Sequence, residues 1–498
     1  MKSKILLFSI LFIASSTLFA QWEYVGSDTG ITDFDVWYID LEFQPNSNDP
    51  HIFYQYYDIN NGAYFSMKKF NGVSWEYVGE EVIDELMVAN DHLSLAFDPI
   101  NANVPIAYYH NGQLTTPPVV IKLSGNSWEQ LPGLSNFMIQ GNSDVQNDPV
   151  STPRNYDFDV SPTGNPVLGF QDNNCTAGGF ENPPGNMSVV THDGAEWQFL
   201  GNSCLSPRAA GNIDLQYNPV TDELFGYHKG GNELTEFDQI RQLVKLNGTQ
   251  WDSITSPAIP TSFIVGLMEI NPVSGHPFIF DWGYSDGIGS ERQFKMYEWD
   301  GTDLISHFEN DDLDIMHANW LTAFHPITGE IHILYRQQDF ENGPHLNIKK
   351  YNGSGWVDTP FSDIQDLPNT AMDYKDMAFH PNGDLYIVRR EGLAGEAVVI
   401  KRDGEPAIGI SEASNTSSKL QVYPNPTTGN LRFIDFSSHQ SENYNVAIYN
   451  TLGTIVMNRQ MNAEQIREGV DVTTLSSGYY SIQLSNSQRT YQSQFVVE

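Results

Sequence analysis

A short hairpin pattern recurs along the chain and restricts its fold more than any other feature. Each copy has a Gly between two strand-like stretches, usually as Asn-Gly or Asp-Gly, and five copies have a Trp three residues later, as in "FNGVSW". The turn glycines are Gly72, Gly125, Gly194, Gly248, Gly301, Gly353 and Gly404, at successive spacings of 53, 69, 54, 53, 52 and 51 residues. Asn-Gly and Asp-Gly suit the left-handed turn of a tight β-hairpin. A repeat of this length indicates an array of similar supersecondary units.

A second marker, an apolar or aromatic residue followed by any residue and then Pro, lies between the hairpins. It ends at Pro45, Pro99, Pro162, Pro219, Pro272, Pro326 and Pro381. An aromatic-rich stretch such as "HIFYQYY" or "PFIFDW" usually follows within a few residues. Each unit therefore contains four strands: one into the Pro turn, one out of it and two in the Gly hairpin. Seven such units predict an all-β fold, a seven-bladed β-propeller.

The seventh unit, "AVVIKRDGEPAIG", lacks the Trp-containing fourth strand, whereas a copy of that strand, "QWEYVG", stands alone at residues 21–26. We therefore expect residues 22–26 to pair with residues 397–402. This pairing would close the ring of a propeller that spans residues 21–410, and it would remove an exposed sheet edge. Six blades plus a separate hairpin would leave the N-terminal copy unexplained.

The first 20 residues contain two lysines, an apolar run from Ile5 to Ile13 and small residues up to Ala20. This order is typical of a secretory signal peptide. No later stretch approaches the roughly 20 apolar residues that a membrane helix needs. We expect an exported protein without a membrane span, either secreted or held at the cell surface.

A polar linker, "SEASNTSS" at residues 411–418, separates the propeller from a C-terminal module at residues 419–498. The module contains "VYPNPTTGNLRF", "VAIYNTLGTIV" and "LSSGYYSIQLS", whose strand and turn residues predict a small β-sandwich. In this order the segments resemble the type A sorting domain of the Bacteroidetes type IX (Por) secretion system. The resemblance implies contact with the type IX secretion machinery, passage across the outer membrane and, often, cleavage of this domain.

The chain is strongly acidic, with 62 Asp and Glu residues against 25 Lys and Arg residues and a net charge of -37. Such a charge repels nucleic acid and anionic lipid, so neither is an expected partner. The acidic loops are compatible with a structural Ca²⁺, although no spacing matches a dedicated site. We expect no required cofactor and a monomeric protein.

Cys175 and Cys204 are the two cysteines of the chain. Export brings them into an oxidising compartment, so we expect them to form a disulfide. Two free thiols or a contribution to a metal site stay open as alternatives.

In a propeller, the loops that lead into each first strand share one face with the loops that leave each second strand. We call this face the mouth. The substrate-binding residues predicted there are Arg154, Arg208, His228, Lys229, Trp282, Asn319, Arg336, Tyr374 and Arg390. The predicted platforms for sugar stacking are Tyr54, Tyr108, Trp282 and Tyr335. Polar residues at strand ends also satisfy loop backbone groups, so an architectural role for any single position stays open.

Two histidines stand out in the second unit. His92 begins the first strand and His110 ends the second, and antiparallel pairing would place them side by side. Tyr156 begins the next unit. β-Elimination from a uronic acid needs a base such as neutral His, an acid such as Tyr and a cation that holds the carboxylate. We predict His92 and His110 as base and partner, Tyr156 as acid, and Arg154 or Arg208 as the cation.

This arrangement resembles the seven-bladed ulvan lyases, which use a His pair, a Tyr and an Arg on the propeller face. The resemblance implies a polysaccharide lyase that cleaves uronate-containing, ulvan-like glycans. Two other classes stay open: a non-catalytic glycan- or protein-binding propeller, and a glycoside hydrolase. Hydrolysis needs two carboxylates about 5 to 10 Å apart. The residues available for that role are Asp91, Asp157, Asp172, Asp214, Asp281 and Asp376.

Overall fold

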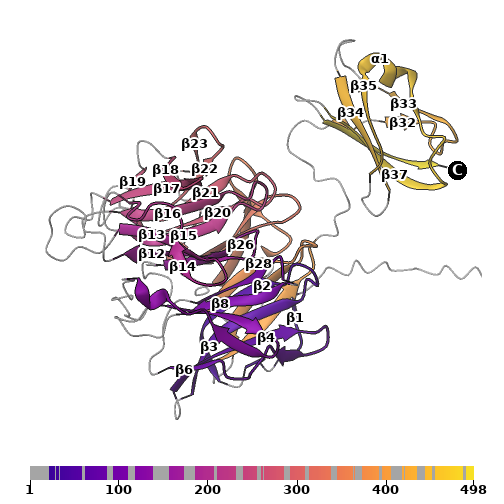
Figure 1. The fold of residues 1–498 in the computed structure, drawn as a ribbon. Coiled ribbons are helices and arrows are strands. Elements are labelled where there is room, and N and C mark those ends of the chain that lie inside the picture. Colours follow the sequence, from indigo (N-terminus) through magenta and orange to yellow (C-terminus); the bar gives the residue numbers. More distant parts are fainter. Residues whose placement is uncertain are drawn as a thin grey trace, which may run out of the picture. The chain divides into compact units, whose positions relative to one another are not determined.

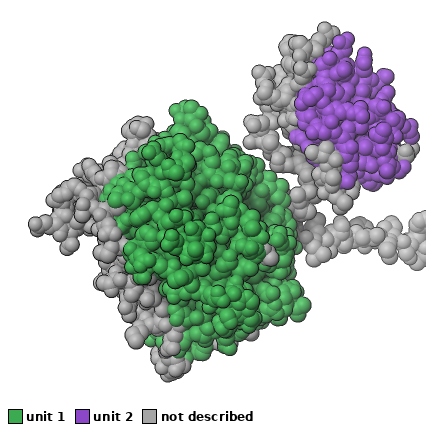
Figure 2. All heavy atoms as spheres, in the orientation of Figure 1, with its two compact units in different colours: residues 1–405 green, residues 406–498 purple. Residues whose placement is uncertain are grey.

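The structure is a computed structural model that divides into two compact units, residues 1–405 and 406–498, which are described separately (Figure 2). It describes residues 22–28, 30–32, 34–58, 62–86, 93–101, 103–109, 118–137, 156–172, 186–206, 210–230, 239–254, 259–261, 263–284, 292–308, 313, 315–337, 345–362, 364, 373–391, 395–404, 418–419, 421–434, 443–450, 455–485 and 490–497. The predicted signal peptide lies outside these residues.

The described part of the first unit contains seven antiparallel sheets (Figure 1). Each sheet has four main strands, in sequence order apart from the last sheet, and two of the sheets have a fifth short strand. We number these sheets as blades 1 to 7. Blade 1 contains β2 (Asp35–Phe43), β3 (Pro50–Asp58), β4 (Gly62–Phe70) and β5 (Trp75–Tyr77), with β6 (Asp84–Leu86) beside β4. Blade 2 contains β7 (Leu93–Asp98), β8 (Val104–Tyr109), β9 (Val119–Ser124) and β10 (Ser127–Gln130), followed by a short 3-10 helix (Leu134–Asn136).

The next three blades repeat this order. Blade 3 contains β11 (Tyr156–Val160), β12 (Pro166–Asp172), β13 (Asn186–His192) and β14 (Trp197–Phe199). Blade 4 contains β15 (Ala210–Tyr217), β16 (Leu224–Gly230), β17 (Gln239–Asn247) and β18 (Gln250–Ser253), with β19 (Ile259–Thr261) beside β17. Blade 5 contains β20 (Phe263–Ile270), β21 (Pro277–Tyr284), β22 (Arg292–Trp299) and β23 (Leu304–Phe308).

Blade 6 contains β24 (Ile315–Phe324), β25 (Ile331–Gln337), β26 (His345–Tyr351) and β27 (Trp356–Asp358). Blade 7 contains β28 (Asp373–Phe379), β29 (Leu385–Glu391) and β30 (Glu396–Arg402), and its fourth strand is β1 (Glu23–Tyr24). Glu23 pairs with Lys401 and Tyr24 with Ile400, and the N–H of Val25 donates to the carbonyl of Val399. The isolated N-terminal copy of the fourth strand thus completes the last blade, as the repeat predicts.

The first strands of the blades follow one another around a closed ring. Contacts join β2 to β7, β7 to β11, β11 to β15, β15 to β20, β24 to β28 and β28 to β2. A hydrogen bond between Thr322 of β24 and Glu269 of β20 links blades 5 and 6. The seven-bladed β-propeller predicted from the repeat is confirmed.

The Trp of the hairpin repeat joins each of several blades to the blade before it. The indole N–H of Trp75 donates to the carbonyl of Val25 at 2.7 Å, and Trp251 donates to Leu200 at 2.7 Å. The Gly that follows the acceptor lets the indole approach, because a Cβ on Gly26 would lie 3.0 Å from Trp75 and one on Gly201 2.8 Å from Trp251. This contact explains why the repeat carries Trp and Gly together, as in "WEYVG".

Apolar residues two positions before each Pro, and four positions before it in every blade except blade 6, fill the spaces between blades. In blade 1, Leu41 and Phe43 are buried and pack with Val388 and Val399 of blade 7. Second strands are buried on both faces, since a blade packs against a neighbour on each side, and every residue of β12 is buried. The core of the propeller is therefore a series of layers between blades.

The second unit is a small β-sandwich, as predicted. One sheet has the order β31 (Ser418–Lys419), β38 (Thr490–Val497), β37 (Gly478–Ser485), β34 (Asn443–Asn450) and β35 (Ile455–Asn462), and the other has β32 (Gln421–Tyr423), β33 (Asn430–Ile434) and β36 (Val470–Asp471). The helix α1 (Ala463–Glu468) begins with a capping box formed by Asn462 and Gln465. Ser418, the single described residue of the predicted linker, belongs to β31.

Candidate functional site

The predicted catalytic histidines border a described pair of strands. Leu93, the first residue of β7, pairs with Tyr109, the last residue of β8. In the sequence, His92 directly precedes Leu93 and His110 directly follows Tyr109. Both histidines lie outside the described residues, so their roles stay predictions.

The other predicted catalytic groups belong to the next blades. Tyr156 is the first residue of β11, and its backbone pairs with Phe170, but its side chain is not described. Arg154 and Arg208 lie outside the described residues, as does Cys175, the predicted disulfide partner of Cys204. The acid, cation and disulfide assignments therefore also stay predictions.

Three predicted substrate-binding residues are described only in their backbone. Lys229 lies near the end of β16, where it pairs with Gly211, and Tyr374 lies near the start of β28, where it pairs with Arg389. Asn319 lies within β24, directly before Trp320. Lys229 and Tyr374 thus lie toward the mouth ends of their strands, as the repeat predicts.

The predicted stacking platforms need correction. Tyr54, Tyr108, Trp282 and Tyr335 are 2%, 3%, 3% and 1% exposed, respectively. All four lie on second strands and pack into the layers between blades. A ring enclosed on both faces offers no surface to a sugar, so these residues, including Trp282, serve the core instead of the substrate.

His228, also predicted to bind substrate, is 1% exposed. Burial lowers its pKa from 6.5 to about 4, which keeps the imidazole neutral at physiological pH. Neither ring nitrogen has a hydrogen-bond partner among the described residues. The side chain is therefore enclosed and offers no surface to a substrate.

Two arginines from the predicted set reach the surface in part. Arg336, near the end of β25, is half-buried. The side chain of Arg390, near the end of β29, is 35% exposed, and its Nη1 lies 3.1 Å from Oδ1 of Asp35 at the start of β2. This ion pair joins blade 7 to blade 1 at the mouth.

Sequence reasoning missed a pair of exposed aromatic residues beside this ion pair. Trp37 and Tyr57 are each 39% exposed, and their rings lie 5.9 Å apart at an angle of 43°. The register between β2 and β3 shifts between Val36 and Tyr38, so Trp37 lies in a β-bulge. Val36 enters the core with 0% exposure, and the bulge turns Trp37 toward solvent. Strict alternation along β2 would have buried Trp37 on the same face as Ile39, Leu41 and Phe43.

Carboxylates on the first strands connect the blades around the axis. In each case, the carboxylate of the residue five positions before the Pro of one blade accepts a hydrogen bond. The donor is the backbone N–H of the residue four positions before the Pro of the next blade. The observed bonds are Asp40 to Leu95 at 2.6 Å, Asp157 to Leu215 at 2.8 Å, Asp214 to Met268 at 2.9 Å and Asp376 to Leu41 at 2.7 Å. Asp159 accepts from Tyr217 at 2.6 Å in the same manner. We call these residues the carboxylate ladder.

Burial and, to a smaller extent, mutual repulsion raise the pKa values of carboxylates on the first strands. The pKa of Asp40 rises from 3.8 to about 8 through desolvation and the charge of Asp376. Desolvation raises the pKa of Asp159 to about 7. Although Glu42 still contacts solvent, desolvation and the charges of Asp40, Asp376 and Asp159 raise its pKa well above its usual range. The carboxylates of Asp40 and Asp376, on the first strands of adjacent blades 1 and 7, therefore lie close enough to interact.

A buried ion pair joins blades 4 and 5. Nη1 of Arg241 lies 2.9 Å from Oδ1 of Asp281, and both side chains are almost fully enclosed. Arg241 also donates to the hydroxyl of Tyr227 at 2.5 Å, and that hydroxyl lies 3.2 Å from Asp281. Gly266 provides the space, because a Cβ there would lie 1.9 Å from Nη1 of Arg241.

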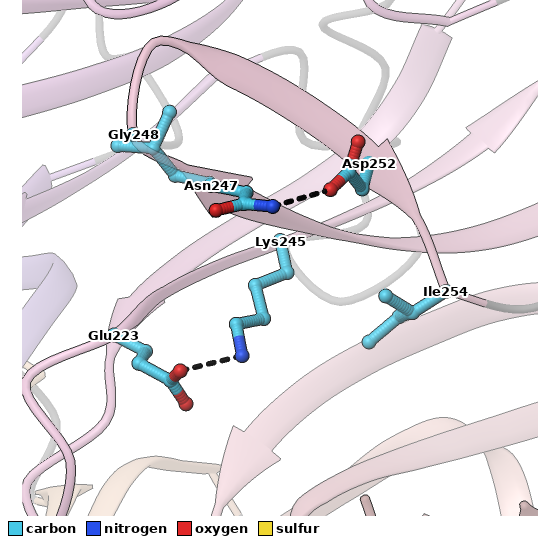
Figure 3. Close-up of a pocket in the computed structure, with 7 residues that line it drawn as sticks. Glu223, Lys245, Asn247, Gly248, Asp252 and Ile254 are labelled. Carbon is cyan, nitrogen blue, oxygen red and sulfur yellow. Dashed lines mark hydrogen bonds and ion pairs between the residues drawn. The ribbon is translucent and has the colours of Figure 1, made fainter. Parts of the chain in front are cut away.

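A cavity of about 450 Å³ lies on the opposite face from the mouth, between a Pro turn and a Gly hairpin of blade 4 (Figure 3). Lys245 pairs with Glu223 at 2.5 Å, and Asn247 donates to Asp252 at 3.1 Å. The described residues that line it include none of the predicted catalytic or binding residues.

Neither a metal cluster nor a membrane helix occurs in the described segments. Among the residues that the structure describes, no group of three or more His, Cys, Asp or Glu side chains is arranged to hold a metal ion. The described helices include none that is long and apolar enough to cross a membrane.

The fold and the C-terminal sandwich define the class of the protein. Residues 421–498 match the model of the secretion system C-terminal sorting domain, that of the type IX system. The protein is thus a type IX cargo, a β-propeller exported to the cell surface or released. The comparison with curated protein sequences finds no match.

Among solved structures, the similar chains have low sequence identity to this one. The β-propeller domain of the Trilobed protease from Pyrococcus furiosus is 9% identical, with a TM-score of 0.45 over 76% of this chain and 99% of that one. The Aleuria aurantia lectin is 12% identical, with a TM-score of 0.35 over 65% and 96%. The α-L-arabinanase of Penicillium chrysogenum is 13% identical, with a TM-score of 0.36 over 76% and 96%.

Proposed function

We propose that the propeller is a polysaccharide lyase that cleaves a uronate-containing glycan outside the cell by β-elimination. The observation that carries the proposal is the pairing of Leu93 with Tyr109 at the mouth end of blade 2. The chain places one histidine directly beyond each partner, His92 and His110. Continuation of this register by one residue would place the two imidazoles side by side, one as the base and the other as the group that orients it.

The reaction uses groups that the sequence supplies at adjacent blades. A neutral histidine removes the proton from the ring carbon next to the carboxylate, and the electron pair forms a carbon-carbon double bond as the glycosidic carbon-oxygen bond breaks. Tyr156 gives its proton to the departing oxygen. Arg154 or Arg208 stabilises the carboxylate as negative charge develops on it. The protein acts as a monomer on extracellular polysaccharide and needs no cofactor for these steps.

The hydrogen bonds of the predicted acids disfavour the hydrolase alternative. Asp157, Asp214 and Asp376 each accept a backbone N–H from the next blade in the carboxylate ladder. Asp172 accepts from Ser188 at 3.0 Å, and Asp281 pairs with Arg241. These five carboxylates have architectural partners, whereas hydrolysis needs two that face a sugar.

The test is the ultraviolet absorbance of the unsaturated uronate product while the full chain acts on ulvan, alginate, polygalacturonate and glucuronan. We expect a rising signal on at least one polymer. His110→Ala and Tyr156→Phe should each slow it by about 100-fold or more, the usual contribution of a general acid or base. His380→Ala, at a Pro turn on the opposite face, should keep the wild-type rate. A flat trace on every polymer by folded protein would refute the proposal.

A further inference from the structure

We infer that Trp37 and Tyr57 form a sugar-binding subsite at the junction of blades 1 and 7, which holds an uncharged pyranose ring of the glycan. The inference rests on the proposed function for the identity of that glycan and extends it with a second contact area. Both aromatic residues lie at the mouth, since β2 begins at Asp35 and β3 ends at Asp58.

The β-bulge in β2 makes Trp37 available. Buried positions of β2 alternate as Ile39, Leu41 and Phe43, and unbroken alternation would bury Trp37 as well. The bulge instead buries Val36, which is 0% exposed, and leaves Trp37 39% exposed. Bulges often redirect a side chain at a binding site. The exposed part of the indole is apolar surface that a bound sugar ring would remove from water.

Neighbouring groups hold the indole in one orientation. Its Nε1 donates to Oδ2 of Asp35 at 3.2 Å, and the other oxygen of Asp35 pairs with Arg390 at 3.1 Å. Gly395 permits this approach, because a Cβ there would lie 2.1 Å from Oδ1 of Asp35. Tyr57 supports the indole from the side, with ring centroids 5.9 Å apart. The aromatic surface is thus positioned before any ligand arrives.

The chemistry of these groups selects the ligand. Aromatic faces stack on the apolar C–H face of a pyranose ring, and partly exposed carboxylate and guanidinium groups exchange hydrogen bonds with ring hydroxyls. Asp35 and Arg390 together carry no net charge, so the subsite does not favour an anionic sugar. Blade 1 is adjacent to blade 2, where His92 and His110 border the paired strands. A glycan that alternates neutral and acidic sugars can therefore contact both areas.

The test is affinity electrophoresis of the full chain in gels that contain galactan, glucomannan, laminarin or ulvan. We expect retardation of the wild type by at least one of them. Trp37→Ala and Tyr57→Ala should each raise the dissociation constant about three- to tenfold, the range for loss of one aromatic contact. Trp37→Phe should restore most of the affinity. Tyr479→Ala removes a ring that is 72% exposed in the sorting domain and should change nothing.

The outcomes separate this inference from the proposed function. Elimination activity with no retardation, or with retardation that Trp37→Ala leaves unchanged, overturns the subsite and leaves the lyase proposal intact. Retardation that depends on Trp37, without elimination on any polymer, supports the subsite and overturns the lyase. An equal loss of affinity in Tyr479→Ala overturns the subsite, because the effect would not be specific. Thermal unfolding of each variant verifies that the propeller remains folded.

Discussion

The glycine at position 266 faces the ion pair of Arg241 and Asp281 across the junction between blades 4 and 5. A buried ion pair need not stabilise a fold, but breaking one by displacing a partner leaves a charge without compensation. Position 266 therefore requires glycine, because any side chain there would displace Arg241 from Asp281. Nothing in the local sequence marks the position, because the contact depends on residues from three other strands.

We predict that Gly266→Ala lowers the free energy of unfolding by about 3 to 5 kcal/mol, the usual cost of breaking a buried pair. The new methyl group would lie 1.9 Å from Nη1 of Arg241, so the guanidinium must move away from Asp281. Chemical denaturation measures the change. Gly355→Ala is the matched control, because its Cβ would meet nothing within 4 Å and its cost should stay within about 0.5 kcal/mol. Equal effects of the two substitutions would contradict the prediction.

At the scale of the element, the Trp-Gly contact ties β1 to blade 1. We predict that Gly26→Ala destabilises the propeller by about 1 to 3 kcal/mol more than Gly72→Ala does, because it adds a clash to the backbone strain. Both glycines have a φ of 91°, but only the Cβ of residue 26 would approach Trp75, at 3.0 Å. Thermal unfolding compares them. Equal losses would mean that the contact with Trp75 contributes nothing.

The strand pattern was predictable because turn chemistry and alternation are local. Gly72 and its equivalents set the period, and the lone "QWEYVG" segment identified the strand that closes the ring. The side-chain environment was less predictable. Tyr54 and Trp282 lie on second strands that are buried on both faces. An aromatic residue in the sequence of such a strand therefore indicates a core position. Trp37 is exposed through a bulge, and a bulge shifts the register that sequence alternation assumes.

At the scale of the whole molecule, the carboxylate ladder couples the stability of the ring to pH. The pKa of Asp40 is raised from 3.8 to about 8 and that of Asp159 to about 7, so the folded protein retains protons that the unfolded chain has released. The free energy of unfolding therefore falls as the pH rises from the ordinary pKa of 3.8 to the raised values of about 7 and about 8. Below pH 6.5 the buried His228 and His332, with pKa values of about 4, oppose the trend, because they gain protons on unfolding.

We predict that the unfolding temperature of the propeller decreases from pH 6.5 to pH 8, the window in which the opposing contribution of the histidines fades while Asp40 still titrates. Asp40→Asn should flatten this decrease, because the amide oxygen still accepts the N–H of Leu95 but carries no charge. Differential scanning calorimetry measures both proteins. A wild-type unfolding temperature that rises over this window would contradict the raised pKa of Asp40.

The most direct test of the lyase proposal is the origin of oxygen in the product. Full-length protein should digest a uronate polysaccharide in water enriched in heavy oxygen, and mass spectrometry should follow the new chain ends. Elimination breaks the carbon-oxygen bond without water, so we predict unlabelled, unsaturated ends whose formation requires His110 and Tyr156. Saturated products that gain one labelled oxygen for each bond cleaved would mean hydrolysis and would contradict the account.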